Sequence, residues 1–421
     1  MRSIAPNPPD IEDLDGRCFH EHEVTSIRRD LLDWYDRNKR DLPWRPDDFV
    51  GENVEERAYS VWVSEMMLQQ TTVGRVKDYF PRWMSKWPSL SHLSQASQEE
   101  VNSLWAGLGY YRRARFLLEG AKHIVENSGG IFPRDAAELR QIPGIGNYTA
   151  GAIASIAFKQ PVPAVDVNVI RVISRLRAIS DATRESKLLW KLAGEIVDLE
   201  RPGSFNQALM DLGSAVCKTK APLCSGCPIA GSCKAFLLQK QSADKEVAVS
   251  VTDFPAKSIK AAPREEFTAV CVVELLPLGD DGSLFLLVQR PENGLLAGLW
   301  EFPAVLLKDP KTSAKTRRTS VNKYLRSSLG LSLDKSSVKT REEVGSYRHV
   351  FSHIRLNMFV EWLQISSTDD NAAMEAKTLP RTQWVKYSAL EKMGLTSGVK
   401  KVFSMVSKHR DKRQGSKRKT P

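Results

Sequence analysis

Apolar residues recur at helical spacing through the first half of the chain, from about residue 22 to residue 235. The stretch 24–35 is typical, with Thr25 or Ser26 as a possible N-cap. Further helices are expected at 59–71, 72–87, 97–105, 111–127, 136–142, 149–158, 167–179, 186–197 and 204–216. The connections between them are short. The pattern therefore predicts an all-α domain of roughly ten helices over residues 22–240.

The pattern changes after residue 240. Residues 241–264 lack periodicity and carry several charges, which indicates an interdomain linker. From Glu265 the period is two and β-branched residues are frequent, which predicts strands at 267–276, 283–290, 356–363 and 382–385. Helical pieces at 319–329 and 397–406 complete an α+β domain over residues 265–407. Residues 1–21 are expected to be disordered, and residues 408–421 form a low-complexity basic tail.

Charge and length limit the possible functions. The chain has 421 residues, too many for one core, and a formal charge of +11 that suggests a polyanionic partner. The tail from Lys408 holds seven Lys/Arg and one Asp, so the remainder is only mildly basic at about +5. Binding to nucleic acid would thus depend on local clusters. No apolar run has membrane-span length, and the acidic first twenty residues do not resemble a secretory signal.

Four of the six cysteines fall within seventeen residues, at Cys217, Cys224, Cys227 and Cys233. This clustering indicates a metal site in a reducing compartment rather than a disulfide framework. The spacing C-x6-C-x2-C-x5-C contains a single C-x2-C pair, whereas structural zinc sites usually show two. The asymmetry favours a [4Fe–4S] cluster, with tetrahedral zinc as the alternative.

A hairpin sequence lies at the centre of the helical half, in the stretch 139–171. Pro143 ends the preceding helix, and Gly144 and Gly146 can adopt the positive φ that a tight turn needs. The backbone N–H groups of such a turn, leading into a helix, suit a phosphate. An ordinary helix–loop–helix turn is the alternative reading of the same residues.

Two acids stand in otherwise apolar surroundings. Glu65 lies in the helix 61–71, and Asp166 lies in the stretch 162–169. Burial would raise the pKa of Glu65, which suits a general acid, although an exposed Glu at a helix edge is the ordinary alternative. One neutral and one ionised acid are what cleavage of a glycosidic bond requires. Gln69 and Gln70 follow Glu65 by one turn and could contact base edges.

Two aromatic segments suggest contacts with bases. The stretch 105–115 joins Trp105 and Tyr110 to three arginines at a glycine turn, which suits insertion or stacking, with a solvated helix start as the alternative. Farther along, Phe351, Ser352 and His353 are suited to stacking on a base and hydrogen-bonding it. The alternative there is a core Phe beside a surface Ser.

Taken together, these segments resemble the MutY family of adenine DNA glycosylases. The resemblance covers about residues 24–240 and rests on five motifs in family order, which are Ser64-Glu-Met-Met-Leu-Gln-Gln-Thr, Gly107-Leu-Gly-Tyr-Tyr, Pro143-Gly-Ile-Gly, Val165-Asp-Val-Asn-Val and the cysteine loop. The hairpin and the cysteine loop are shared with the wider endonuclease III superfamily. The segments Trp300-Glu-Phe-Pro and Phe351-Ser-His favour the adenine-specific branch.

The resemblance implies a helix-hairpin-helix glycosylase domain with an iron–sulfur loop at 217–233 and a Nudix-like recognition domain. The implied activity is removal of adenine mispaired with 8-oxoguanine or guanine in double-stranded DNA. Glu65 would protonate adenine at N7, and Asp166 would stabilise or trap the oxocarbenium ion. The remaining implied roles are site organisation by Tyr148 and Asn168, an adenine pocket of Trp44, Arg45, Leu68 and Gln207, a wedge beside 8-oxoguanine from Gln70 and Tyr110, and a check of the lesion by Phe351, Ser352 and His353.

Three departures refine the expectation. Bifunctional relatives carry a Schiff-base Lys where this chain has Tyr148, so a monofunctional glycosylase is predicted. Residues 241–264 contain no Cys, so no zinc site is expected in the linker. The segment 321–330, which would hold magnesium in a Nudix pyrophosphatase, has no carboxylate, so the C-terminal domain should bind rather than hydrolyse.

Other functions remain open at this level. The same scaffold could serve a thymine or oxidised-pyrimidine glycosylase, or a non-catalytic DNA-binding module, although a pure binder has no need for both acids. A monomer is expected. The basic tail favours import into the nucleus, with a mitochondrial share as an alternative. Sliding-clamp or mismatch-repair partners are compatible with the family, but no Gln-led clamp motif is evident.

Overall fold

The computed structural model describes residues 17–45, 53–244, 248–257, 262–276, 282–292, 294–331, 333–334, 336–366 and 379–417. The chain divides into two compact units. Unit 1 comprises Met1–Ala96 and Arg115–Ile259, and unit 2 comprises Ser97–Ala114 and Lys260–Pro421. Most of the N-terminal stretch predicted to be disordered, parts of the linker (245–247 and 258–261) and the last four residues of the tail lie outside the described residues. No helix in the described part is long and apolar enough to cross a membrane.

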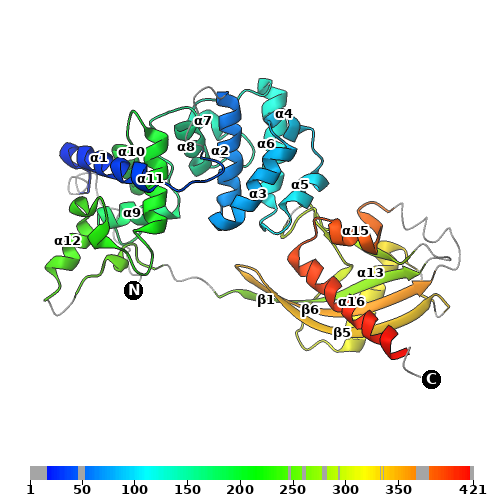
Figure 1. Ribbon diagram of the computed structural model, residues 1–421. Helices are drawn as coiled ribbons and strands as arrows, with labels where there is room; N and C mark the ends of the chain where they lie inside the picture. The colour runs from blue at the N-terminus through cyan, green and yellow to red at the C-terminus, as the bar shows by residue number, and fades with distance from the viewer. Residues whose placement is uncertain are drawn as a thin grey trace, which may run out of the picture. The chain divides into compact units, whose positions relative to one another are not determined.

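The helical half agrees closely with the periodicity (Figure 1). The first helix begins at Glu21 with His20 as its N-cap, five residues before Thr25 and six before Ser26, the two expected caps. The elements are α1 (Glu21–Asn38), α2 (Val54–Leu68), α3 (Val73–Lys86), α4 (Leu90–Ser94), α5 (Gln98–Trp105), α6 (Arg112–Ser128), α7 (Ala136–Leu139), α8 (Asn147–Ile156), α9 (Val167–Leu176), α10 (Ser186–Ile196), α11 (Pro202–Ala215), α12 (Lys234–Gln241) and the 3₁₀ turns η2 (Cys224–Gly226), η3 (Ala230–Ser232) and η4 (Val251–Asp253). Helices α4 and α12 were not predicted from the sequence.

Two helices form the centre of unit 1. From Ala58 to Met67, helix α2 is buried on almost every side, except for the intermediate Ser60, and α8 is buried continuously from Thr149 to Ile156. A helix that is apolar around its whole circumference belongs in a protein interior. Helix α2 packs on α8, and α11 packs on both α8 and α9. The acids and amides that the sequence singled out lie on three of these four helices, α2, α9 and α11, or directly at their ends.

Unit 2 contains a mixed seven-stranded sheet with the order β3-β2-β1-β6-β5, in which β4 also pairs with β1 and β7 with β2. Strands β1 and β6 are parallel and the other pairs are antiparallel. The elements are β1 (Arg264–Leu276), β2 (Leu284–Gln289), β3 (Trp300–Glu301), β4 (Ala304–Leu307), α13 (Ala314–Leu329), β5 (Val338–Val350), β6 (Ile354–Ser366), β7 (Thr382–Lys386), α15 (Tyr387–Lys392) and α16 (Ser397–Lys417).

Strand β5 was missed at the sequence level, although it is thirteen residues long. Its sequence, Val-Lys-Thr-Arg-Glu-Glu-Val-Gly-Ser-Tyr-Arg-His-Val, has no apolar face, and none of its residues is fully buried. It lies at one end of the strand order and, among the described strands, pairs with β6 alone. An edge strand rich in charge gives no period-two signal.

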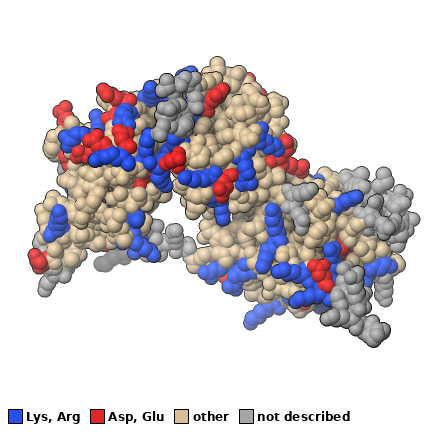
Figure 2. Space-filling model, viewed as in Figure 1, with Lys and Arg blue, Asp and Glu red and all other residues tan. Residues whose placement is uncertain are grey.

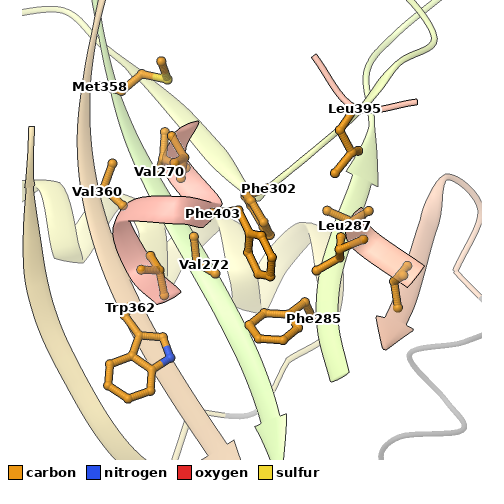
Figure 3. Close-up of a cluster of buried hydrophobic side chains, with 14 residues drawn as sticks. Val270, Val272, Phe285, Leu287, Phe302, Met358, Val360, Trp362, Leu395 and Phe403 are labelled. Atoms are coloured by element: carbon orange, nitrogen blue, oxygen red, sulfur yellow. The ribbon is translucent and has the colours of Figure 1, made fainter. Parts of the chain in front are cut away.

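Alternate residues of β1 serve two separate cores, because successive side chains of a strand point to opposite faces. Val270 and Val272 join a core with Phe285, Phe302 and residues of α16, as Figure 3 shows. Ala269, Cys271 and Val273 join a second core, which includes Val321, Leu325 and Leu329 of α13. The sheet is thus covered by α16 on one face and α13 on the other.

Helix α16 extends well into the predicted basic tail. It ends at Lys417 rather than near residue 406. His409 and Arg413 both contact Glu342 of β5, and Arg410 contacts the buried Glu274 of β1. These pairs explain why the helix continues past its apolar part. Figure 2 shows Lys and Arg interspersed with Asp and Glu on the helical unit, in agreement with local rather than global positive charge.

Candidate active site

Glu65 lies buried in the middle of unit 1. It stands on α2, is 5% exposed, and accepts a hydrogen bond of 2.5 Å from the hydroxyl of Tyr148 on α8. Burial raises the pKa of Glu65 above its ordinary value, while the Tyr148 hydrogen bond and the charge of Arg45 oppose that rise. The carboxyl is therefore not a surface group at a helix edge. It holds its proton to a higher pH than an exposed Glu, as a general acid requires.

Asp166 is the N-cap of α9 and is held by three donors. Its Oδ1 accepts from the backbone N–H groups of Asn168 and Val169 at 2.9 and 2.8 Å, and its Oδ2 accepts from Asn168 Nδ2 at 2.7 Å. Burial raises the pKa of Asp166 as well, and these hydrogen bonds act against it. The two acids thus differ in their surroundings as expected, but the pKa of each is displaced upward.

A chain of hydrogen bonds runs from Asp166 to the cysteine loop. Asn168 Oδ1 accepts from Arg171 Nη2 at 2.9 Å, and the same nitrogen donates to the Gly213 carbonyl at 2.6 Å. Arg171 Nε donates to the Cys217 carbonyl at 2.8 Å. Asn168, which orients Asp166, is therefore held by Arg171, and Arg171 is held in turn by the carbonyl of Cys217, the first residue of the loop.

The hairpin that precedes α8 needs only one of its two glycines for its backbone conformation. Gly144 has φ +82°, and a Cβ there would lie 2.3 Å from Cβ of Phe116. Gly146 has φ −92° and is the N-cap of α8, with nothing within 4 Å of a built Cβ. The expectation that both glycines adopt positive φ is wrong for Gly146, because the extended N-cap conformation is open to any residue.

The four residues expected to form an adenine pocket all belong to unit 1, and the charge of one of them, Arg45, acts on the pKa of Glu65. Trp44 is buried edge-on against Phe80, and its indole N–H has no partner among the described residues. Arg45 Nη1 contacts Asp211 at 2.8 Å. Leu68 is the last residue of α2, and half-buried Gln207 on α11 donates to the Gly203 carbonyl at 3.2 Å.

Gln70 and Tyr110, the expected wedge residues, share an unusual backbone conformation. Both are exposed and both lie in the left-handed region, at φ +54° and +48°. Residues other than glycine rarely adopt it, and such strain is concentrated at functional sites. Gln70 belongs to unit 1 and Tyr110 to unit 2. Gln69 is half-buried and reaches Thr149 Oγ1 at 3.4 Å.

Tyr110 is supported by an arginine that the sequence analysis placed in a solvated or DNA-facing segment. Arg113 is 6% exposed and donates to the Gly109 carbonyl at 3.0 Å. Its guanidinium lies over the rings of Trp105 and Tyr110. Burial lowers the pKa of Arg113 to about 10.

Phe351, Ser352 and His353 form the turn between β5 and β6. The Phe351 N–H donates to the Ile354 carbonyl at 2.8 Å, and its ring lies edge-on to His349 at 4.5 Å. Ser352 and His353 are exposed. The segment is part of unit 2, whereas both acids are in unit 1.

The four clustered cysteines line one hollow, together with Arg175 and Phe236. No three His, Cys, Asp or Glu side chains in the described ranges gather closely enough to ligate a single metal ion. Thiols spread around a hollow fit a multi-atom iron–sulfur cluster better than one zinc ion, whose four ligands must converge at about 2.3 Å. Arg175 is 2% exposed and donates to the Cys217 Sγ at 3.2 Å and to the carbonyls of residues 217–219 and 254.

Sequence reasoning missed Arg171, Arg175 and Asp211. The two arginines are spaced i, i+4 on a helix whose other residues are largely apolar, so they lie on one buried face. Asp211 stands in the apolar stretch 208–212, which is the same signal that marked Glu65. Each could have been found by the rule that an ionisable residue in an apolar segment needs a partner.

Comparison with known proteins covers both units. Residues 63–195 match the family described as HhH-GPD superfamily base excision DNA repair protein, and residues 275–405 match the NUDIX domain. The chain is 48% identical over 93% of its length to an adenine DNA glycosylase of Arabidopsis thaliana, of which it covers 65%.

Animal proteins match at similar levels. The chain is 43% identical to the adenine DNA glycosylase of Mus musculus, over 94% of this chain and 81% of the mouse protein. It is 42% identical to the adenine DNA glycosylase of Homo sapiens, over 90% of this chain and 74% of the human protein. The resemblance to this family, the helix-hairpin-helix glycosylase fold and the Nudix-like fold are thereby confirmed. The chain belongs to the adenine DNA glycosylases, enzymes of base excision repair that hydrolyse N-glycosyl bonds.

Proposed function

We propose that this chain removes adenine mispaired with 8-oxoguanine or guanine in duplex DNA, and that it does so without cutting the strand. The observation that carries the proposal is the buried Glu65 carboxyl, hydrogen-bonded by Tyr148 and close enough to Asp166 for that charge to act on its pKa. Two acids with different hydrogen-bonding surroundings suit a reaction that protonates a leaving group and stabilises a cation.

The chemistry begins with extrusion of the adenine from the duplex, because the glycosidic bond is inaccessible inside the stack. Glu65 donates its proton to N7 of adenine, and the C1′–N9 bond breaks with its electron pair on the base. The Asp166 carboxylate stabilises or traps the resulting oxocarbenium ion. Water held with the help of Asn168 then adds to C1′ and releases its proton, which leaves an abasic site.

Tyr148 supports hydrolysis alone. A lyase forms a Schiff base through an amine, which then allows the strand to break. In this chain the corresponding hairpin position carries a phenol whose hydroxyl is bound to Glu65. Borohydride should therefore trap no covalent enzyme–DNA product, and strand breaks should appear only after alkali treatment.

Recognition of the mispair is assigned to three groups of residues. Trp44, Arg45, Leu68 and Gln207 would contact the adenine, and Gln70 and Tyr110 would fill the space beside 8-oxoguanine. The exposed turn at Phe351, Ser352 and His353 would distinguish 8-oxoguanine from guanine. The left-handed backbone of Gln70 and Tyr110 and the exposure of the turn support these roles.

Cys217, Cys224, Cys227 and Cys233 would hold a [4Fe–4S] cluster. The hollow that they line, and the hydrogen bond from Arg175 to Cys217 Sγ, fit such a group. The cluster would stabilise the loop rather than act on the sugar. Visible absorption from sulfur-to-iron charge transfer, together with the iron content per chain, would test this assignment.

The glycosylase assignment is tested by adenine release from an 8-oxoguanine:adenine duplex. Wild type should release adenine and Glu65→Gln should not, whereas Glu56→Gln, an exposed acid of the same helix, should behave as wild type. A duplex panel with guanine:adenine, guanine:thymine and oxidised pyrimidines would reveal a different base specificity. Unchanged release by Glu65→Gln would refute the mechanism.

Ser352→Ala tests the proposed role of the turn at Phe351, Ser352 and His353, with Ser346→Ala on β5 as its matched control. In Ser352→Ala, the rate of adenine release from the 8-oxoguanine:adenine duplex should fall toward the rate measured on the guanine:adenine duplex. In Ser346→Ala it should not change. An equal loss on both duplexes would contradict a role in lesion recognition.

We also propose nuclear import through the basic C-terminal segment. Arg410 and Arg413 bind the sheet, so a truncation before Lys408 would damage unit 2 as well as any signal. Substitution of the exposed Lys408 and Lys412 by Gln separates the two effects. Unaltered nuclear entry of that variant would contradict a role for these lysines.

A further inference from the structure

One buried acid beside the site has no part in the proposed chemistry. Asp211 on α11 is 2% exposed, and its two carboxylate oxygens contact different arginines. Arg45 Nη1 lies 2.8 Å from Oδ2, and Arg40 Nη2 is bonded to Oδ1. Each oxygen of the carboxylate thus has a guanidinium partner of its own.

The two arginines differ in how much they depend on Asp211. The Arg45 side chain is 12% exposed, whereas that of Arg40 is 39% exposed. A guanidinium removed from water is costly without a counter-charge, while a partly exposed one can be hydrated instead. Asp211 therefore decides where the Arg45 guanidinium lies, and Arg40 mainly completes the coordination of the carboxylate.

The residue before Asp211 on α11 contacts the tyrosine that is hydrogen-bonded to Glu65. Met210 Sδ lies 3.5 Å from the hydroxyl of Tyr148, which donates to Glu65. The charge of Arg45 lowers the pKa of Glu65, and the charge of Asp211 raises it. The cation and its counter-ion thus act on the Glu65 carboxyl together and in opposite senses.

We propose that Asp211 is a positioning residue that fixes the Arg45 guanidinium beside Glu65 and partly neutralises its charge there. Asp211 does not touch the substrate. The inference rests on the proposed glycosylase function and adds to it a residue on which the protonation of the general acid depends.

The groups that face Glu65 come from four places in unit 1. They are Tyr148 of α8, Arg45, Asp166 at the start of α9 and Asp211 of α11. Tyr35 of α1 also faces Arg45 and Asp211. Arg45 is the cation of this set. Without the Asp211 charge it would favour the ionised form of Glu65 without opposition, so the acid would lose its proton at lower pH.

The test is the pH profile of adenine release by the full chain on an 8-oxoguanine:adenine duplex under single-turnover conditions. In Asp211→Asn the high-pH limb should move down by about one pH unit, which lowers the rate of adenine release about tenfold on the alkaline side of the limb with little change on its acid side. Asp211→Glu should restore most of the wild-type profile. Arg40→Gln, which keeps the Arg45 contact, should leave the limb in place.

A purely structural role would lower the rate by the same factor at every pH, and that result would overturn the proposal. If Asp211→Asn does not fold, judged by circular dichroism, the double variant Arg40→Gln/Asp211→Asn removes one unpaired cation and carries the same expected shift. No adenine release by wild type would refute the proposed function. Normal wild-type release with an unmoved limb in the Asn variants would refute the role of Asp211 alone.

Discussion

Glu65 shows how one residue can serve the reaction at a cost to stability. Its pKa is raised by burial, so the folded chain binds the proton of Glu65 more tightly than the unfolded chain does. This contribution to stability is complete below the ordinary pKa of Glu and is lost as the pH rises through the raised value. Above that value the folded protein must hold a buried, ionised carboxylate.

Glu65→Gln should therefore be inactive and yet more stable at alkaline pH. We expect its free energy of unfolding at pH 8 to exceed that of wild type by on the order of 1 kcal/mol, since Gln can still accept from Tyr148. The difference should shrink toward pH 5. Urea unfolding at the two pH values measures it, with Glu56→Gln as the control. A loss of stability at pH 8 would contradict the direction of the shift.

At the scale of elements, the turn before α8 requires glycine at a single position. Gly144→Ala places a Cβ against Phe116 at positive φ, and we expect a loss of about 1–3 kcal/mol in unfolding free energy together with weaker duplex binding. Gly146→Ala should cost less than about 1 kcal/mol, since its φ is ordinary and the space around it is open. Thermal unfolding and duplex titration of both variants would check this, and equal effects would count against it.

Helix α9 is tied to the cysteine loop by Arg175. Its guanidinium donates to carbonyls of the loop and to Cys217 Sγ, and it is buried. Arg175→Gln should leave several of these acceptors unsatisfied, at about 1–3 kcal/mol for each group that water cannot reach. The expected result is reduced iron content per chain and lower visible absorbance. Arg184→Gln, at a site 80% exposed, is the control; normal iron loading in Arg175→Gln would contradict this account.

At the scale of the whole molecule, a segment from the helical half belongs to the C-terminal unit. Ser97–Ala114, which contains α5 and Tyr110, is grouped with unit 2. Trp300 Nε1 donates to Glu99 at 3.2 Å, and Gly394 lies against the backbone of Asn102 and Ser103. One proposed wedge residue is therefore carried by the same unit as the Phe351–His353 turn.

Gly394→Ala tests whether this grouping matters for recognition. A Cβ there would lie 2.7 Å from backbone atoms of Asn102 and Ser103, which cannot move aside as a flexible side chain can. We expect the preference for 8-oxoguanine:adenine over guanine:adenine to fall several-fold. Gly398→Ala, whose Cβ would make only ordinary contacts, should keep the preference. Unchanged discrimination by Gly394→Ala would show that α5 docking is not needed.

The sequence by itself determined the helical half, most of the strands, the cysteine loop and the family. These depend on neighbours along the chain, namely periodicity over a few turns and motifs of fewer than twenty residues. Glu65 and Asp166 could also be identified from the sequence, because an ionisable residue in an apolar segment stands out there. Strand β5 was not predicted, since an edge strand with no buried face shows no alternation of apolar and polar residues.

The tertiary structure decided what surrounds those residues. Tyr148 meets Glu65 across 83 positions, and Arg45 meets Asp211 across 166. Burial, the direction of each pKa shift and the membership of Ser97–Ala114 in unit 2 follow from such contacts. A pattern of adjacent residues cannot supply them, because electrostatics and desolvation depend on distance in space rather than on separation along the chain.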